Sequence, residues 1–118
     1  GSVITVLATD LPLTERQLGR VARRASVGLA RTGTFIGNGS GDIVLAFSTA
    51  NRFFHHETAP VLSMSVFNEN LMDLPFRATA EAVEEAVLDS MVCAETVTGR
   101  DGHVRRSLAE YIARDGLL

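Results

Sequence analysis

The chain has 118 residues and a formal net charge of −3, with 46% hydrophobic and 21% charged residues. These proportions are typical of one globular domain and exclude a disordered segment. No apolar run is long enough to cross a membrane, and the single cysteine, Cys93, excludes a disulfide within the chain. All eleven Lys/Arg positions are arginine, so a lysine-dependent phosphate loop and a Schiff-base lysine are also excluded. The α-amino group is therefore the only primary amine.

The first half of the chain predicts two strands separated by a helix and a turn. The apolar residues 3–8 predict a buried strand. Behind a capping box that begins at Thr14, apolar residues at helical spacing predict one helix over 15–31. The glycine-rich residues 34–42 predict a tight turn, and residues 43–49 predict the second strand.

The second half predicts mainly helices. Weak alternation over residues 61–67 indicates a third strand, and a long amphipathic pattern predicts a helix over 74–95 that contains a packed Cys93. A last helix is expected over 103–114, capped by Asp101 or Gly102. The order of elements is α/β or α+β in class. Two or three strands are few for such apolar helix faces, so we expect another chain to complete the core.

Gly1 and Ser2 have two interpretations. A Gly-Ser pair is a common remnant of an expression tag. Alternatively, Ser2 is an N-terminal nucleophile that is released when the Gly1–Ser2 bond is cleaved. Short motifs have high false-positive rates, so the pair alone favours the remnant, and the rest of the chain has to decide.

Seven sequence strings, in order along the whole chain, resemble the smaller, C-terminal β subunit of the L-aminopeptidase/D-esterase and β-aminopeptidase family. They lie at residues 2–10, 18–24, 28–33, 38–42, 46–51, 82–86 and 94–102. The resemblance implies an αββα sandwich, two sheets between helix layers, completed by a separate larger α subunit. It implies a precursor that cleaves itself between a Gly and a Ser, with residues 1–118 as the single catalytic β portion.

The same resemblance implies a function. Family members remove N-terminal residues from small peptides, amides or esters, some of them with D- or β-amino acids, and use no metal or organic cofactor. They assemble as several αβ units, so we expect a homo-oligomer of αβ units. We expect a cytoplasmic protein, or a periplasmic one if the α portion carries a signal.

The chemistry of Ser2 fits this family. A serine hydroxyl needs a base to remove its proton. An N-terminal serine carries its own base, because an unperturbed α-amine has a pKa of about 7.7–8.0, close to working pH. Ser2 would then form an acyl-enzyme, with its amine acting directly or through one water.

Ser40 and Asp42 are the next candidates. The β-aminopeptidase members have a Ser-x-Glu motif at this point, and Ser40-Gly41-Asp42 keeps the serine and an acid that is one methylene shorter. By this resemblance Ser40 orients Ser2 or relays its proton, and Asp42 orients Ser40 or holds the amine as a cation. The alternative is a turn serine and a strand-capping acid. The main oxyanion side chain would come from the α subunit, and structural turn roles are favoured for Asn38 and Asn51.

Other patterns point away from metal and nucleic acid. His55-His56-Glu57 lacks metal-ligand spacing, so the loop 50–60 is expected to contribute to the substrate pocket or to a subunit contact. Arginines over 16–24 occur without interleaved aromatic residues in a chain of negative net charge, which indicates a solvated or intersubunit helix face. Two rival functions stay open. One is an acyltransferase of the ornithine-acetyltransferase type, and the other is a non-enzymatic homologue that binds or supports a partner.

Overall fold

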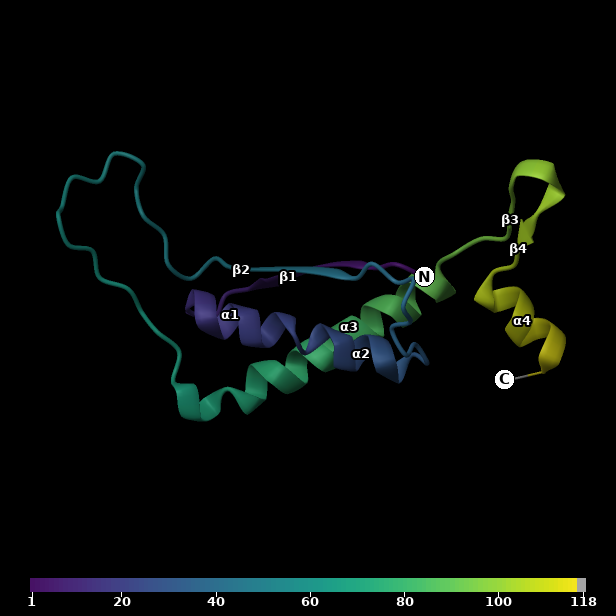
Figure 1. Cartoon of the computed structure of the whole chain (residues 1–118), viewed down its shortest axis with the longest axis horizontal. Coiled ribbons are helices and arrows are strands. Elements are labelled where there is room, and N and C mark those ends of the chain that lie inside the picture. The colour runs from purple at the N-terminus through teal and green to yellow at the C-terminus, as the bar shows by residue number, and fades with distance from the viewer. Residues whose placement is uncertain (117–118) are drawn as a thin grey trace.

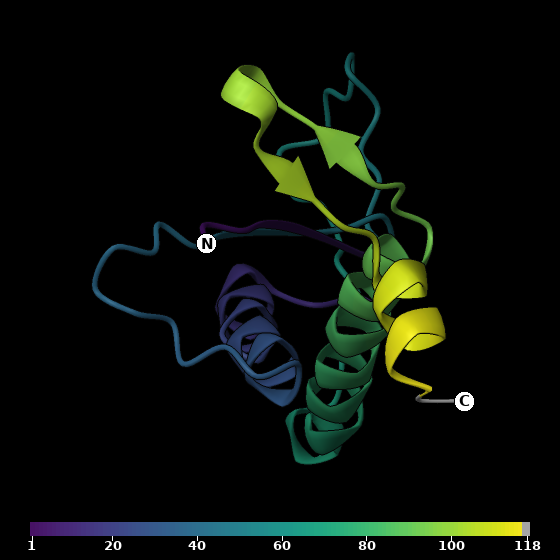
Figure 2. The same cartoon turned by 90° about the vertical axis from the view of Figure 1, so that its right-hand side faces the viewer.

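A computed structural model describes residues 1–116 of the chain. Strands β1 (Ile4–Thr9) and β2 (Ile43–Ser48) pair in parallel along their whole length. Helices α1 (Glu15–Ala22), α2 (Ala25–Arg31) and α3 (Asp73–Val92) lie on the same side of these strands (Figures 1 and 2). Both predicted strands are confirmed, and so is the mixed α/β class.

Two helices replace the single helix that was expected over 15–31. The break falls at Arg23 and Arg24, where the Arg24 N–H donates to the Val21 carbonyl at 2.8 Å, a tighter turn than in an α-helix. The Arg24 guanidinium lies 3.9 Å from the centre of the Phe76 ring on α3. Apolar residues keep their helical spacing through the break, so the pattern alone predicted continuity, and that prediction is wrong at these residues.

The core lies between the helices and one face of the sheet. It contains two buried clusters, one of Leu13, Val21 and Met72 and one of Ala25, Leu29 and Val83. At Gly28 a Cβ atom would lie 2.5 Å from the Ala80 carbonyl oxygen, so α2 and α3 approach more closely than any larger residue allows. The opposite sheet face is exposed and apolar, and the inner face of β1 is only partly buried. Within residues 1–116, the prediction of a buried strand is therefore wrong for β1, because no layer covers its outer face. The side chains of that exposed face are Ile4, Val6, Ala8, Ile43, Leu45 and Phe47.

Residues 49–68 form a long loop that extends beyond the carboxyl ends of the strands (Figure 1). The third strand expected over 61–67 is not formed, because these residues pair with no strand among residues 1–116. The Asn51 side chain instead acts as a strand partner for Ser65. Its amide donates to the Ser65 carbonyl and its oxygen accepts from the Ser65 N–H, both at 3.0 Å.

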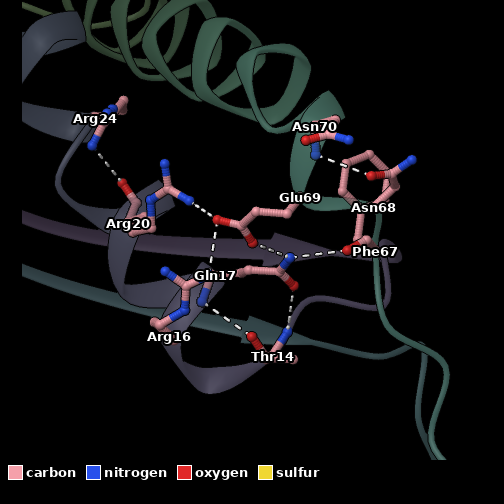
Figure 3. Close-up of polar contacts among 9 residues, drawn as sticks. All are labelled: Thr14, Arg16, Gln17, Arg20, Arg24, Phe67, Asn68, Glu69 and Asn70. Carbon is pink, nitrogen blue, oxygen red and sulfur yellow. Dashed lines mark hydrogen bonds and ion pairs between the residues drawn. The ribbon is translucent and has the colours of Figure 1, made fainter.

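A buried glutamine holds the end of this loop against α1 (Figure 3). Gln17, only 2% exposed, donates to the Phe67 carbonyl at 3.0 Å and to Glu69 at 2.9 Å, while its oxygen accepts from the Thr14 N–H. The Thr14 hydroxyl accepts from the Gln17 N–H, which confirms the predicted capping box. These contacts, together with those of Arg16 and Arg20 to Glu69, are called the Gln17 network below.

The C-terminal part differs most from the sequence prediction. Helix α3 ends at Val92 instead of residue 95, and a short hairpin of β3 (Val97–Thr98) and β4 (Val104–Arg105) follows. Its turn contains a 3₁₀ segment over Arg100–Gly102. Helix α4 (Leu108–Asp115) begins five residues later than expected, and its N-terminus is capped by the Ser107 hydroxyl and not by Asp101 or Gly102. In residues 1–116, no helix is both long and apolar enough to cross a membrane.

Candidate active site

The topology brings Ser2 and Asp42 to the same end of the sheet. Ser2 precedes β1 and Asp42 precedes β2. Parallel strands have their amino ends at one edge, so the two residues are neighbours although they lie 40 positions apart in sequence. The Ile43 N–H donates to the Val3 carbonyl at 3.0 Å and fixes this alignment.

One carboxylate oxygen of Asp42 contacts both Val3 and Ser40. Its Oδ1 accepts from the Val3 N–H at 2.9 Å and lies 3.0 Å from the Ser40 hydroxyl oxygen. The Ser40 N–H donates to the Gly37 carbonyl at 2.8 Å, which closes the turn. The shorter aspartate therefore reaches Ser40 directly, despite the methylene that it lacks compared with glutamate.

The Ser40 hydroxyl has two acceptors within reach. Its oxygen lies 2.8 Å from the Gly1 carbonyl oxygen and 3.0 Å from Asp42 Oδ1. A hydroxyl has one proton, so Ser40 can donate to only one of them at a time. In the chain described here the Ser2 nitrogen is part of the Gly1–Ser2 peptide bond, and the carbonyl of that bond is one of the two acceptors.

Ser2 is exposed, and its hydroxyl oxygen accepts a hydrogen bond from the Gly41 N–H at 3.0 Å. A Cβ atom at Gly41 would lie 3.6 Å from this oxygen. The main chain of the turn at Gly41 therefore lies directly against the Ser2 side chain. Sequence reasoning named Ser2, Ser40 and Asp42, and the glycines of the turn indicated that main chain could approach this site closely. It did not identify the N–H groups of Gly41 and Val3 as the donors.

A pocket of about 190 Å³ adjoins these residues. It lies between the amino ends of the strands, the end of α2 and the second half of α3. Its lining residues are Gly1, Ser2, Val3, Leu29, Thr32, Thr34, Asp42 and Val87. Apolar and hydroxyl side chains, together with the Asp42 carboxylate, thus line a small pocket beside Ser2.

The histidine loop lies elsewhere. His55 and His56 belong to the loop 49–68, which begins where β2 ends, while Ser2 lies where β1 begins. A strand of six residues spans about 20 Å, so this loop lies far from Ser2 within one chain and does not line the pocket beside it. The expected contribution of the loop to the substrate pocket or to a subunit contact stays a prediction. In residues 1–116, no cluster of three His, Cys, Asp or Glu side chains could hold a metal ion.

Two further expectations can be compared with the structure. Cys93 is exposed just after α3, with its sulfur 3.7 Å from Asp89 Oδ1, so the prediction of a packed cysteine inside the helix is wrong. Asn51 has the structural role that was favoured for it, through its contacts with Ser65.

A lowered pKa occurs outside the Ser2 site, at Glu69. The hydrogen bond from Gln17 and then the contacts with Arg16 and Arg20 hold the pKa of the Glu69 carboxyl below its ordinary value of 4.5. This carboxylate stays ionised at neutral pH and serves the Gln17 network.

Comparison with known proteins places these residues in a family. The sequence matches the profile of peptidase family S58 over residues 1–105. The chain belongs to this family. The resemblance drawn from the seven strings is therefore confirmed, and the S58 match includes Ser2, Ser40 and Asp42.

Similar proteins of known sequence or structure support the same family assignment. A beta-peptidyl aminopeptidase of Sphingosinicella microcystinivorans is 42% identical over 108 residues, which are 92% of this chain and 27% of that relative. A Pyrococcus horikoshii protein of known structure is 54% identical with a TM-score of 0.87, over 97% of this chain and 32% of that one. The L-aminopeptidase D-Ala-esterase/amidase of Ochrobactrum anthropi, described as a prototype of the serine aminopeptidases and a variant of the Ntn hydrolase fold, is 43% identical with a TM-score of 0.79, over 94% and 33%. This S58 chain thus spans between about a quarter and a third of the length of the relatives that it matches.

Proposed function

We propose that this chain is the C-terminal portion of a self-processing serine aminopeptidase or amidase, with Ser2 as its N-terminal nucleophile. The observation that carries the proposal is the contact of Ser40 with both the Gly1 carbonyl and Asp42, beside the Ser2 hydroxyl, in a chain of family S58. The substrates are small peptides, amides or esters, including those with D- or β-amino acids. The names of the Sphingosinicella and Ochrobactrum relatives support this range.

Self-cleavage would proceed at the Gly1–Ser2 bond. The Ser2 oxygen attacks the Gly1 carbonyl carbon, and its proton passes to the Ser2 nitrogen, which leaves as a free amine while Gly1 becomes an ester on the Ser2 oxygen. Water then hydrolyses the ester and releases the Gly1 carboxylate. The Ser40 hydroxyl, 2.8 Å from the Gly1 oxygen, would stabilise the negative charge that develops there.

Substrate cleavage would use the amine that self-cleavage frees. This amine takes the Ser2 hydroxyl proton, directly or through one water, while the Ser2 oxygen attacks the carbonyl after the substrate's N-terminal residue. The same proton goes to the leaving amine, and an acyl-enzyme remains until water releases the acid. Asp42, through Ser40 or directly, would favour the charged form of the amine. No cofactor takes part in these steps.

A larger α subunit from the same precursor would complete the fold as an αββα sandwich. The apolar outer face of the β1–β2 sheet supports this part of the proposal, because Ile4, Ile43 and Leu45 are 74%, 61% and 59% exposed. Apolar sheet faces are stable when another layer covers them. A second sheet of the α subunit fits this face, and several such αβ units would assemble into the oligomer.

The decisive experiment is Ser2→Ala in the full-length protein, with Ser63→Ala as the matched control in the exposed loop. We expect the Ser2 variant to remain one uncleaved chain and to lose hydrolysis of aminoacyl amides by about a thousandfold or more. The control should give two fragments and full turnover. Normal cleavage and turnover in the Ser2 variant would disprove the proposal.

Product analysis separates the proposal from its rivals. With an added acceptor amine, a hydrolase releases mainly the free acid, whereas an acyltransferase makes mainly the new amide. A protein that cleaves itself but turns over no aminoacyl amide or ester would be a non-enzymatic homologue.

A further inference from the structure

The glycine-rich turn before β2 has an asparagine followed by a glycine at its tip. The Ser40 N–H donates to the Gly37 carbonyl at 2.8 Å, so Asn38 and Gly39 are the two central residues of a tight turn. Both of them are exposed, and neither has a positive φ, as in a type I turn. The Asn38–Gly39 pair therefore lies at the surface, directly before the residue that contacts Asp42.

The rest of the chain does not hold the side chain of Asn38 or the N–H of Gly39. Within residues 1–116, the hydrogen bonds of this turn are made by Ser40, Gly41 and Asp42, and none involves those two groups. A Cβ atom at Gly39 would meet no atom within 4 Å. The space around the pair is therefore open, and no hydrogen bond has to break before the two groups approach each other.

The three other asparagines of the chain have different surroundings. Asn51 uses both ends of its amide on Ser65, and the Asn68 oxygen accepts from the Asn70 N–H at 3.0 Å. The N–H that follows Asn70, that of Leu71, donates to the Asn68 carbonyl at 3.0 Å. None of the three is followed by glycine. They are therefore internal references for any reaction that depends on the glycine.

We propose that Asn38 is a site of spontaneous deamidation, with water as the only co-reactant. Asparagine is one of the thermolabile residues. The Gly39 nitrogen attacks the Asn38 Cγ atom and forms a new N–C bond. The bond from Cγ to Nδ2 breaks, and the proton of the Gly39 N–H leaves with the side-chain nitrogen as ammonia. Glycine favours this step because no Cβ atom crowds its nitrogen, and the reacting atoms are neighbours in one chain.

Water then opens the five-membered succinimide ring at one of its two carbonyl carbons. Opening at the former side-chain carbonyl gives aspartate at position 38 with an ordinary main chain. Opening at the main-chain carbonyl gives isoaspartate, in which the chain continues through the side-chain carbon. Neither route includes oxidation or reduction, and both convert a neutral amide into a carboxylate.

The isoaspartate product changes the candidate site. It lengthens the main chain by one methylene, two residues before Ser40, and adds a negative charge to the turn that contains Asp42. The Ser40 hydroxyl oxygen lies 2.8 Å from the Gly1 carbonyl oxygen, and a shift by one bond length takes such a contact outside hydrogen-bond distance. This consequence rests on the role proposed above for Ser40, whereas the deamidation itself does not.

Mass spectrometry of the full-length protein tests the deamidation. The protein is incubated at neutral pH and physiological temperature in water enriched in heavy oxygen, and its peptides are followed over time. We expect Asn38 to react at least about tenfold faster than Asn51, Asn68 and Asn70, with one solvent oxygen in each product. Electron-transfer fragmentation should identify both aspartate and isoaspartate at position 38. Equal rates at the four asparagines, or a product without solvent oxygen, would overturn the proposal.

Gly39→Ala is the matched variant. Alanine fits this position, because its Cβ meets no atom within 4 Å and the residue has no positive φ. Its methyl group crowds the attacking nitrogen, so we expect deamidation of Asn38 to slow by about tenfold while turnover of an aminoacyl amide is retained. An unchanged rate of deamidation in this variant would contradict attack by the nitrogen of residue 39.

Turnover of the incubated protein tests the consequence. We expect kcat per total protein to fall in step with the isoaspartate fraction. Asn38→Asp adds the charge without the extra methylene and should change kcat less than about twofold. Full turnover in protein that contains mostly isoaspartate would overturn the link to Ser40. The Ser2→Ala protein should deamidate at the wild-type rate although it is inactive, so failure of this inference and failure of the proposed function are distinguishable.

Discussion

The two ends of β1 are built differently. Beyond the carboxyl end, the Gln17 side chain is buried, and its amide makes hydrogen bonds with Thr14, Phe67 and Glu69. Before the amino end, Ser2 is exposed and Ser40 is half-buried, and hydrogen bonds of Ser40, Gly41 and Asp42 tie the turn to residues 1–3. The Gln17 amide is therefore buried and fully hydrogen-bonded. The region around Ser2 is held in place but remains exposed, as is expected of a site that receives a substrate and contacts a second portion of the protein.

The largest effect on activity is expected from a substitution of Asp42. Asp42→Asn keeps an oxygen for the Val3 N–H but removes the charge beside Ser40. We expect the rate of self-cleavage and kcat to fall about a hundredfold in the full-length protein, since the Ser40 hydroxyl, to which we assign a role in both reactions, loses its charged partner. Gel analysis of cleavage over time and steady-state hydrolysis of an aminoacyl amide measure these rates.

Asp42→Glu is the matched control, because it restores the acid of the Ser-x-Glu motif. It should recover most of the rate. A wild-type rate in Asp42→Asn, with unchanged unfolding, would mean that Asp42 only caps the strand.

The next largest effect is expected at Gln17. Gln17→Met has a similar volume but leaves the Phe67 carbonyl and the Thr14 N–H without their partner. We expect the free energy of unfolding in urea to fall by about 2–3 kcal/mol, with kcat changed less than about twofold. Glu15→Met on the exposed side of α1 serves as the control and should cost less than about 0.5 kcal/mol. A large loss of kcat without loss of stability would contradict the separation of the two ends.

The smallest effect concerns pH. The hydrogen bond from Gln17 is the main cause that lowers the pKa of Glu69 in the folded protein, followed by Arg16 and Arg20. A carboxyl with a lowered folded pKa stabilises the protein above its unfolded pKa and loses that contribution as the pH falls through its folded pKa. Between about pH 5 and about pH 3, wild type should therefore lose slightly more stability than Glu69→Gln. Identical pH profiles from urea unfolding would show that Glu69 is not coupled to folding.

Short sequence patterns correctly predicted the elements that are determined by residues close together in the sequence. The strands at Ile4–Thr9 and Ile43–Ser48 and the capping box at Thr14 follow from apolar runs and a fixed spacing. The break at Arg23 and Arg24 does not, because α3 supplies the Phe76 ring beneath the second arginine. Residues 61–67 have the alternation of a strand, but residues 1–116 provide no strand to pair with them. Their main chain instead makes separate hydrogen bonds to Asn51, Pro12 and Gln17.

The candidate site likewise has features that the sequence predicted and features that it did not. Ser40 and Asp42 entered through the family resemblance, and parallel pairing then brings them next to Ser2. The glycine-rich turn predicted a close approach of main chain, but the hydrogen bonds from Val3 and Gly41 themselves could not be predicted, because any residue type except proline has the same N–H. The Gln17 network was missed for another reason. Its spacing with Thr14 identified a helix start, but nothing near Gln17 in sequence indicated that its amide would reach the loop end 50 residues later.

The paired contacts of Asn51 with Ser65 have a consequence for the variability of the protein. They fix the distance between the two ends of the loop, whatever conformation residues 52–64 adopt. The entropy of closing a loop grows only slowly with its length, so residues inserted between His56 and Glu57 would leave β2 and α3 where they are. The tip of this loop is therefore a suitable place to insert a reporter peptide or an affinity tag, at a distance from the serine that the proposed chemistry needs.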